Sequence, residues 1–308
     1  MSRIVNGRWF VWAWGSLAVA VALLAQLMAA VWGGLLPFNQ SFAAGGDGEW
    51  LNLLATITGL AALTSALGGL VASNLLSGVM RRLGVIALVA AAGLTSVPFL
   101  HGRAADARNV SLAMGGPETS VTIALAVGLV LGGLAAGVFH ARDGWALSIG
   151  LAVTTVAVWL LFVVAIRLPV PKLGPATEAP PIGMPSDVFR TNESLWLGGW
   201  LPLLPISWVV IGAASAIAAK RFAASQATVV LSGVLGAVLI SLSYFAARPS
   251  GGPYIDHTTV QNGAFGWALM IIGGAVLGAA LASRVPVWGT QGAQDSAKRR
   301  GLTANDAS

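Results

Sequence analysis

Few residues in this sequence could do chemistry, and the clearest candidates are two carboxylates, Asp47 and Glu49, between Gly45 and Trp50. Two carboxylates at this spacing can share a divalent cation, or one of them can act as a general base. The spacing is loose, however, and no second motif accompanies the pair. A solvated acidic turn in the first outer loop explains these two residues better than a metal site or a catalytic site.

The other reactive residue types are scattered. We expect two of the three histidines, His101 and His257, in loops and His140 at a helix end, so no pair is placed to ligate haem. The sequence has no cysteine, which excludes disulfides, thiolate catalysis and cysteine-ligated metals. It also lacks a His-Glu-x-x-His motif, a Gly-x-Ser-x-Gly elbow and a P-loop. We therefore expect no cofactor, and we favour a role other than that of an enzyme.

The elements that carry these residues are long apolar segments. The chain has 308 residues, of which 56% are hydrophobic and 9% are charged, whereas a soluble domain has roughly 25% charged residues. About 20 apolar residues of helix cross a bilayer, and the segments are too long for barrel strands. The sequence predicts an all-α polytopic membrane bundle of about eight helices. We expect the spans at 9–34, 51–75, 83–100, 121–140, 145–166, 196–218, 227–246 and 264–283.

Charge is distributed between the loops and not along the segments. Placing the N-terminus inside puts eleven of the 17 basic residues and three of the 11 acidic residues on the inner side. This asymmetry predicts a cell-membrane protein with both termini in the cytoplasm. The formal charge of +6 forms no long basic stripe, so we expect no nucleic-acid partner. The excess of 14 Arg over 3 Lys is typical of a bacterial protein from a GC-rich genome.

The chain divides into a membrane part and a polar end. We predict one integral membrane domain over 1–284 and a disordered cytoplasmic tail over 285–308, which contains Lys298, Arg299 and Arg300. The longest outer loop, 167–195, is rich in proline and therefore extended and stiff. It can cap the bundle or present a ligand to an external partner, and the sequence does not choose between these roles.

Small residues recur in every second predicted helix. Pairs such as Leu-Gly-Gly precede a basic residue four times, which suggests four copies of a two-helix hairpin or two copies of a four-helix half. Small residues spaced four apart let two helix backbones approach closely in lipid. We expect close packing around the bundle centre, with homodimerisation or a substrate groove as alternatives. The predicted helix-packing positions are Gly69, Gly133, Gly137, Gly212, Gly274 and Gly278.

The predicted sixth helix is irregular because Pro202 and Pro205 fall in its outer turns. Prolines bend helices, and broken helices often line transport sites, so these two residues are candidates for a gate. Prolines at a helix start are also ordinary.

None of the eight spans holds a convincing intramembrane charge of the kind that proton relays use. We therefore favour a non-catalytic, permease-like or accessory subunit of a bacterial membrane assembly. Its partners are the lipid bilayer and a further membrane protein or a second copy of the chain. Two alternatives stay open. One is a stand-alone facilitator for an uncharged or lipidic substrate, and the other is a lipid-linked sugar transferase that uses Asp47 and Glu49.

Overall fold

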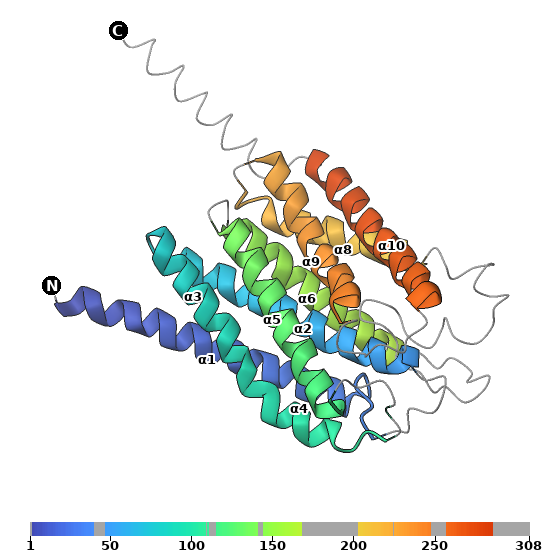
Figure 1. Ribbon diagram of the computed structural model, residues 1–308. Helices are drawn as coiled ribbons and strands as arrows, with labels where there is room; N and C mark the ends of the chain where they lie inside the picture. Colours follow the sequence, from blue (N-terminus) through green and yellow to red (C-terminus); the bar gives the residue numbers. More distant parts are fainter. Residues whose placement is uncertain are drawn as a thin grey trace, which may run out of the picture.

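A computed structural model of the chain describes residues 2–39, 47–108, 110, 115–140, 144–167, 203–223, 225–247 and 257–285. Every regular element in these ranges is a helix, and Figure 1 shows them gathered into one bundle. The helices are α1 (Ser2–Trp32), α2 (Asp47–Asn74), α3 (Val79–Ala92), α4 (Val97–Ala104), α5 (Pro117–Phe139), α6 (Gly144–Arg167), α8 (Leu203–Ala219), α9 (Gln226–Ala246) and α10 (His257–Arg284).

A short 3₁₀ turn, η1 (Gly93–Ser96), joins α3 to α4, so that these elements cross the bundle as one rod. Pro98 explains the interruption, because it lacks a backbone N–H and its ring collides with the carbonyl four residues earlier in an α-helix. The chain accommodates the proline by tightening the turn before it.

The helices are apolar enough to cross a membrane. Six of them, over the residues whose side chains are described, have the length and the composition of a span: α1, α2, the α3–α4 rod, α5, α6 and α9. The described parts of α8 and α10 are apolar too but shorter, at Pro205–Ala219 and Ala268–Arg284. The prediction of an all-α multi-pass membrane bundle is confirmed.

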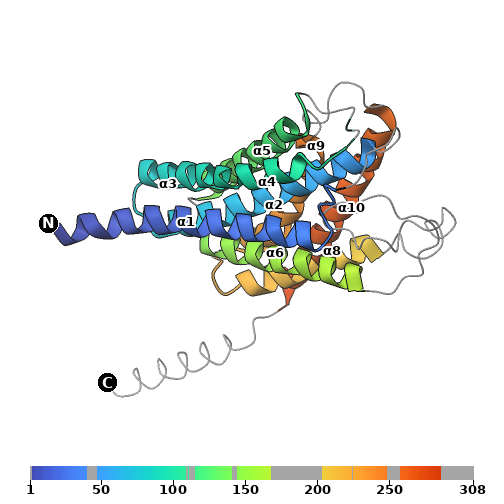
Figure 2. The ribbon, with the colours of Figure 1, turned by 90° about the horizontal axis from the view of Figure 1, so that it is seen from below.

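Helix α2 is the centre of the bundle. It packs against α1, α3, α5, α6 and α9, and 83% of its most apolar stretch is buried, against 22% for α1. Figures 1 and 2 show α2 enclosed by its neighbours and α1 at the periphery, with the N-terminal end of α1 projecting past the other helices.

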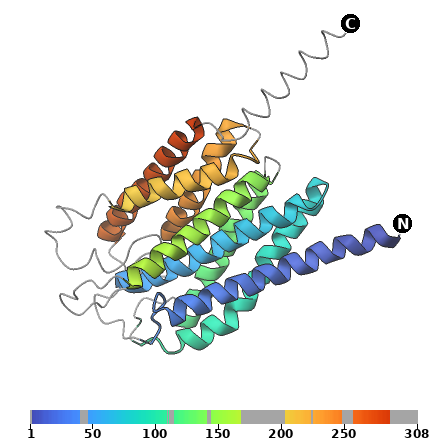
Figure 3. The same cartoon turned by 180° about the vertical axis from the view of Figure 1, so that it is seen from behind.

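The contacts between helices follow the same scheme in the two halves of the chain. The first half consists of α1, α2, the α3–α4 rod and α5, and the second half of α6, α8, α9 and α10. In each half, the second helix packs most extensively against the fourth: α2 against α5, and α8 against α10. Figure 3 shows the second of these pairs beside α6. In neither half do the first and fourth rods form a packed pair among the described residues. This arrangement fits two copies of a four-helix half better than four copies of a hairpin.

One end of the bundle is defined by contacts between helix termini. Trp12 near the start of α1 lies against Gly84 near the start of α3, and Asn74 at the end of α2 lies against Gly144 at the start of α6. In the second half, Gln226 at the start of α9 donates a hydrogen bond to Ser283 near the end of α10. We call this the basic end, because its described charged residues are Arg81, Arg82, Lys220, Arg221 and Arg284.

This topology predicts which loops share a side of the membrane. The chain has no cysteine, so a single cysteine introduced at an exposed position can be labelled without background from native thiols. We expect a membrane-impermeant thiol reagent to label Ser77→Cys and Phe222→Cys from one side of sealed vesicles, and Ala105→Cys from the other. Labelling of Ser77→Cys and Ala105→Cys from the same side would contradict the crossing of the α3–α4 rod.

Candidate functional site

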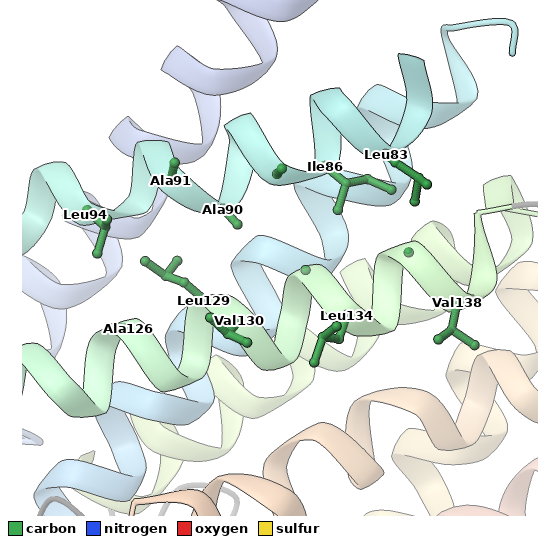
Figure 4. Close-up of a pocket in the computed structure, with 13 residues that line it drawn as sticks. Leu83, Ile86, Ala90, Ala91, Leu94, Ala126, Leu129, Val130, Leu134 and Val138 are labelled. Atoms are coloured by element: carbon green, nitrogen blue, oxygen red, sulfur yellow. The ribbon is translucent and has the colours of Figure 1, made fainter. Parts of the chain in front are cut away.

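A large surface groove lies between the α3–η1 segment and α5. It has a volume of about 610 Å³ and runs from Leu83 to Leu94 on one side and from Ala126 to Val138 on the other. Figure 4 shows the two helices side by side, with Ala90 and Leu94 pointing from one helix towards the other and Leu129 pointing back. Its lining consists only of aliphatic side chains and glycine.

The groove is deep because small residues line it. A Cβ atom added at Gly133 would lie 3.5 Å from the Cβ of Ala90, and one at Gly137 would lie 3.8 Å from Leu83 Cδ2. These are ordinary van der Waals distances, so neither glycine is in tight contact with α3. Below them, Gly69 of α2 approaches both Ile86 and the Cβ of Ala136, the latter at 2.9 Å from an added Cβ. Helix α2 therefore lies behind the buried side chains, such as Ile86, that form the floor of the groove.

The rim of the groove is apolar and outward-facing. Leu94, Val130, Leu134 and Val138 are between 44% and 69% exposed. In a membrane bundle such side chains face lipid, because the hydrocarbon of the bilayer is as apolar as leucine. The groove thus opens sideways into the bilayer and not into water.

Arg82 stands at the basic end of the groove. Its Nε donates a hydrogen bond to the carbonyl oxygen of Leu76 (2.9 Å), and one Nη donates to that of His140 (3.3 Å). The guanidinium thereby joins α3 to the C-terminal ends of α2 and α5, where helix carbonyls lack partners and a cation is favourable. Two of its five N–H groups are used in this way, and the described residues offer it no carboxylate.

Lys220 makes the corresponding contact in the second half. From the end of α8, its ammonium donates to the carbonyl oxygens of Ala282 (3.3 Å) and Ser283 (3.1 Å) and to that of Val285, at the end of α10. In each half, a cation therefore binds carbonyl oxygens at the C-terminal end of the fourth helix. Counting charges along the sequence indicated a basic side but not this use of two particular residues.

The remaining predicted packing glycines lie at much closer crossings. A Cβ on Gly212 would collide with the carbonyl oxygen of Ala275 and lie 2.7 Å from its Cα. On the facing helix, a Cβ on Gly274 would lie 2.5 Å from Pro205 O, and one on Gly278 would collide with Val209 O. The backbones of α8 and α10 are therefore in direct contact along this seam.

Helices α2 and α5 meet in the same manner, through Gly128 and Gly132 of α5, a further pair of small residues spaced four apart. A Cβ on Gly128 would collide with the carbonyl oxygen of Thr58, and one on Gly132 with that of Ala62. Hydroxyls reinforce the seam: Thr58 Oγ1 donates to Ala124 O, and Ser65 Oγ donates to Leu129 O, both at 3.0 Å.

The structure does not bring the two carboxylates to any of these places. Helix α2 begins at Asp47, so Asp47 and Glu49 belong to its first turn and not to the loop before it. Their side chains lie outside the described residues, and their role stays a prediction. Among the described residues, no three His, Cys, Asp or Glu side chains gather as metal ligands would.

Pro202 lies outside the described residues, and Pro205 occupies the first turn of α8. The backbone N–H groups of the first turn have no partners within the helix, so a proline is accommodated there without bending the helix. A gate at Pro202 and Pro205 stays a prediction. His101 was expected in a loop but lies within α4, where its Nε2 is 2.6 Å from Thr122 Oγ1 of α5.

A partly buried polar contact links α1, α2 and α6. Gln26 Nε2 donates to Thr64 Oγ1 (3.0 Å), and Trp159 Nε1 donates to Gln26 Oε1 (3.3 Å). The sequence contained no signal for this contact beyond the presence of one glutamine in an apolar segment.

Comparison of the chain with protein families, with curated proteins and with solved structures finds no match. The site must therefore be interpreted from its own chemistry.

The seam between α8 and α10 predicts a large difference between two glycines of the same helix. A leucine at Gly278 must push the facing backbone away, whereas Gly273 has no atom within 4 Å of an added Cβ. Overpacking costs about 1–3 kcal/mol. We expect Gly278→Leu to lower the Tm of the purified protein by several degrees and Gly273→Leu to leave it near wild type. Equal Tm values would contradict the direct backbone contact.

Proposed function

We propose that this chain is a non-catalytic, multi-pass membrane subunit, an accessory or permease-like part of a larger assembly. The observation that carries the proposal is the close packing of helix backbones at two seams of the bundle. At the α2–α5 and α8–α10 seams the backbones touch, so that even one added methyl group collides. A path that opens and closes between the helices of either pair would have to separate backbones that fit without space. Such seams suit a rigid structural subunit better than a transporter whose helices separate during its cycle.

The periphery offers a surface for a membrane partner. Along α1, Phe10, Trp14, Leu17 and Val21 are between 51% and 61% exposed, and they follow one another at intervals of four, three and four residues. This interval places them on one face of the helix, as in the seam of a coiled coil. The rings of Phe10 and Trp14 already pack together, with their centroids 5.6 Å apart. In the proposed assembly this face receives a transmembrane helix of the partner.

The orientation belongs to the same proposal. The basic end gathers Arg81, Arg82, Lys220, Arg221 and Arg284, which supports a cytoplasmic placement of both termini in a cell membrane.

A co-purification experiment tests the proposal. The protein is tagged at its C-terminus, extracted from its native membrane in mild detergent, and analysed by mass spectrometry for a stoichiometric partner. We expect a partner that is lost with Phe10→Ala plus Trp14→Ala, because these side chains supply the two exposed rings of this face. It should be retained with Leu277→Ala plus Leu281→Ala, which removes two side chains of similar exposure from α10. Purification of the wild type alone and monodisperse would count against an accessory subunit.

The α3–α5 groove favours a second candidate function, a facilitator for a lipidic substrate. Reconstitution into vesicles with a fluorescent phospholipid measures transfer between leaflets. A facilitator would accelerate this transfer, and Gly133→Leu, which fills the groove, would slow it. Transfer no faster than in protein-free vesicles would remove this candidate.

A further inference from the structure

The α3–α5 groove has the length of one membrane leaflet. Leu83 and Leu94 are separated by eleven residues, and Ala126 and Val138 by twelve. At a helical rise of about 1.5 Å per residue, the groove is roughly 17 Å long. The hydrocarbon core of a bilayer is about 30 Å thick, so the groove covers about half of it.

The position of the groove along the membrane normal is fixed by its ends. Leu83 lies opposite Gly137, close to the basic end, and directly follows Arg82. From there the groove extends inward to Leu94 and Ala126, near the middle of the bundle. It therefore lies in the leaflet on the basic side.

The shape and chemistry of the groove select its occupant. An empty apolar groove forfeits the dispersion contacts of its walls, so hydrocarbon fills it in a membrane. The volume of about 610 Å³ is that of a small-ligand site, for which roughly 300–1,000 Å³ is typical. Divided by the length of roughly 17 Å, this volume corresponds to a mean cross-section of about 36 Å², which is too small for a helix about 10 Å across. A flexible acyl chain is thinner than a helix and can extend along the groove.

The charge at the mouth of the groove specifies the headgroup. Arg82 is held in place by the carbonyl oxygens of Leu76 and His140, and it keeps N–H donors beyond those two bonds. A guanidinium fixed in this way is suited to bidentate binding of a phosphate. Basic sites between transmembrane helices on the cytoplasmic side bind anionic headgroups.

From this combination we propose that the groove is a binding site for an anionic phospholipid of the leaflet on the basic side. One acyl chain lies between α3 and α5, above the floor formed by Ile86 and Leu129, and the phosphate is bound by Arg82. The site requires neither a partner subunit nor transfer of the lipid across the membrane, so it stands apart from both proposed functions.

Native mass spectrometry of the delipidated full chain tests the site with two probes, phosphatidylglycerol and phosphatidylcholine of equal chain length. We expect the wild type to bind phosphatidylglycerol more tightly. Gly133→Leu, whose side chain enters the groove, should weaken the binding of both lipids. The matched control is Gly273→Leu, which adds the same side chain to an exposed position of α10 with open space around it. This control should bind as the wild type does.

The headgroup contact is tested separately. Arg82→Gln should weaken phosphatidylglycerol binding about fivefold, the effect of one arginine at an anionic membrane surface, and should weaken phosphatidylcholine binding less, because the choline cation offsets the charge of that lipid's phosphate. Arg221→Gln, which removes an exposed arginine at the end of α8, should change neither lipid. Glycerol phosphate, which has the headgroup charge without acyl chains, should not compete at the concentrations at which the lipid binds.

Three results would overturn the site. The first is wild-type binding in Gly133→Leu, and the second is an equal affinity of the wild type for the two lipids. The third is full competition by glycerol phosphate, which would mean that the groove contributes nothing to the affinity for the lipid. Should Gly133→Leu fail to fold, as judged by its Tm and its elution in size exclusion, Ala90→Leu fills the same space from α3. Wild-type binding in a folded Ala90→Leu variant would overturn the site equally.

Discussion

Direct contact between helix backbones is the constraint on which the rest of this bundle depends. In the hydrocarbon of a membrane, burying apolar side chains gains little, because lipid solvates them as well as protein does. Helices associate there through close packing and hydrogen bonds, and both require small residues at the crossing. The α2–α5 and α8–α10 seams meet this requirement, with glycines against carbonyl oxygens. In the first seam, Thr58 and Ser65 donate across it.

The α3–α5 groove results from the same close packing, at the seam between α2 and α5. Helix α5 uses Gly128 and Gly132 to approach α2, and this places Gly133 and Gly137 towards α3. Since the larger side chains of α3 do not fill the space above these glycines, the groove remains open on the lipid side. The depth of the groove is thus a consequence of how tightly α5 is held elsewhere. Arg82 then fixes the spacing at one end, because it bonds to both neighbouring helices.

The sequence was sufficient to predict the class of fold and most of the crossings, because long apolar runs can satisfy their backbone only as helices in a membrane. It also indicated glycines such as Gly212 and Gly278 as packing positions. It could not tell which helix each glycine would face, and Gly133 and Gly278 look alike in sequence although one lines an open groove and the other touches a backbone. The groove itself depends on which faces of α3 and α5 meet, and no local pattern in the sequence indicates this. Helix ends were also hard to place, as His101 and Asp47 illustrate.

The contact between Gln26 and Trp159 has a consequence for how the chain is made. These two residues are 133 positions apart, so the indole N–H becomes available to the glutamine only after the ribosome has synthesised α6. Until then α1 is held by its packing against α2 and the α3–η1 segment and by the bond to Thr64, while the amide oxygen of Gln26 lacks its donor in the membrane. The polar contacts of the first helix to enter the bilayer are therefore completed only after α6 has been made.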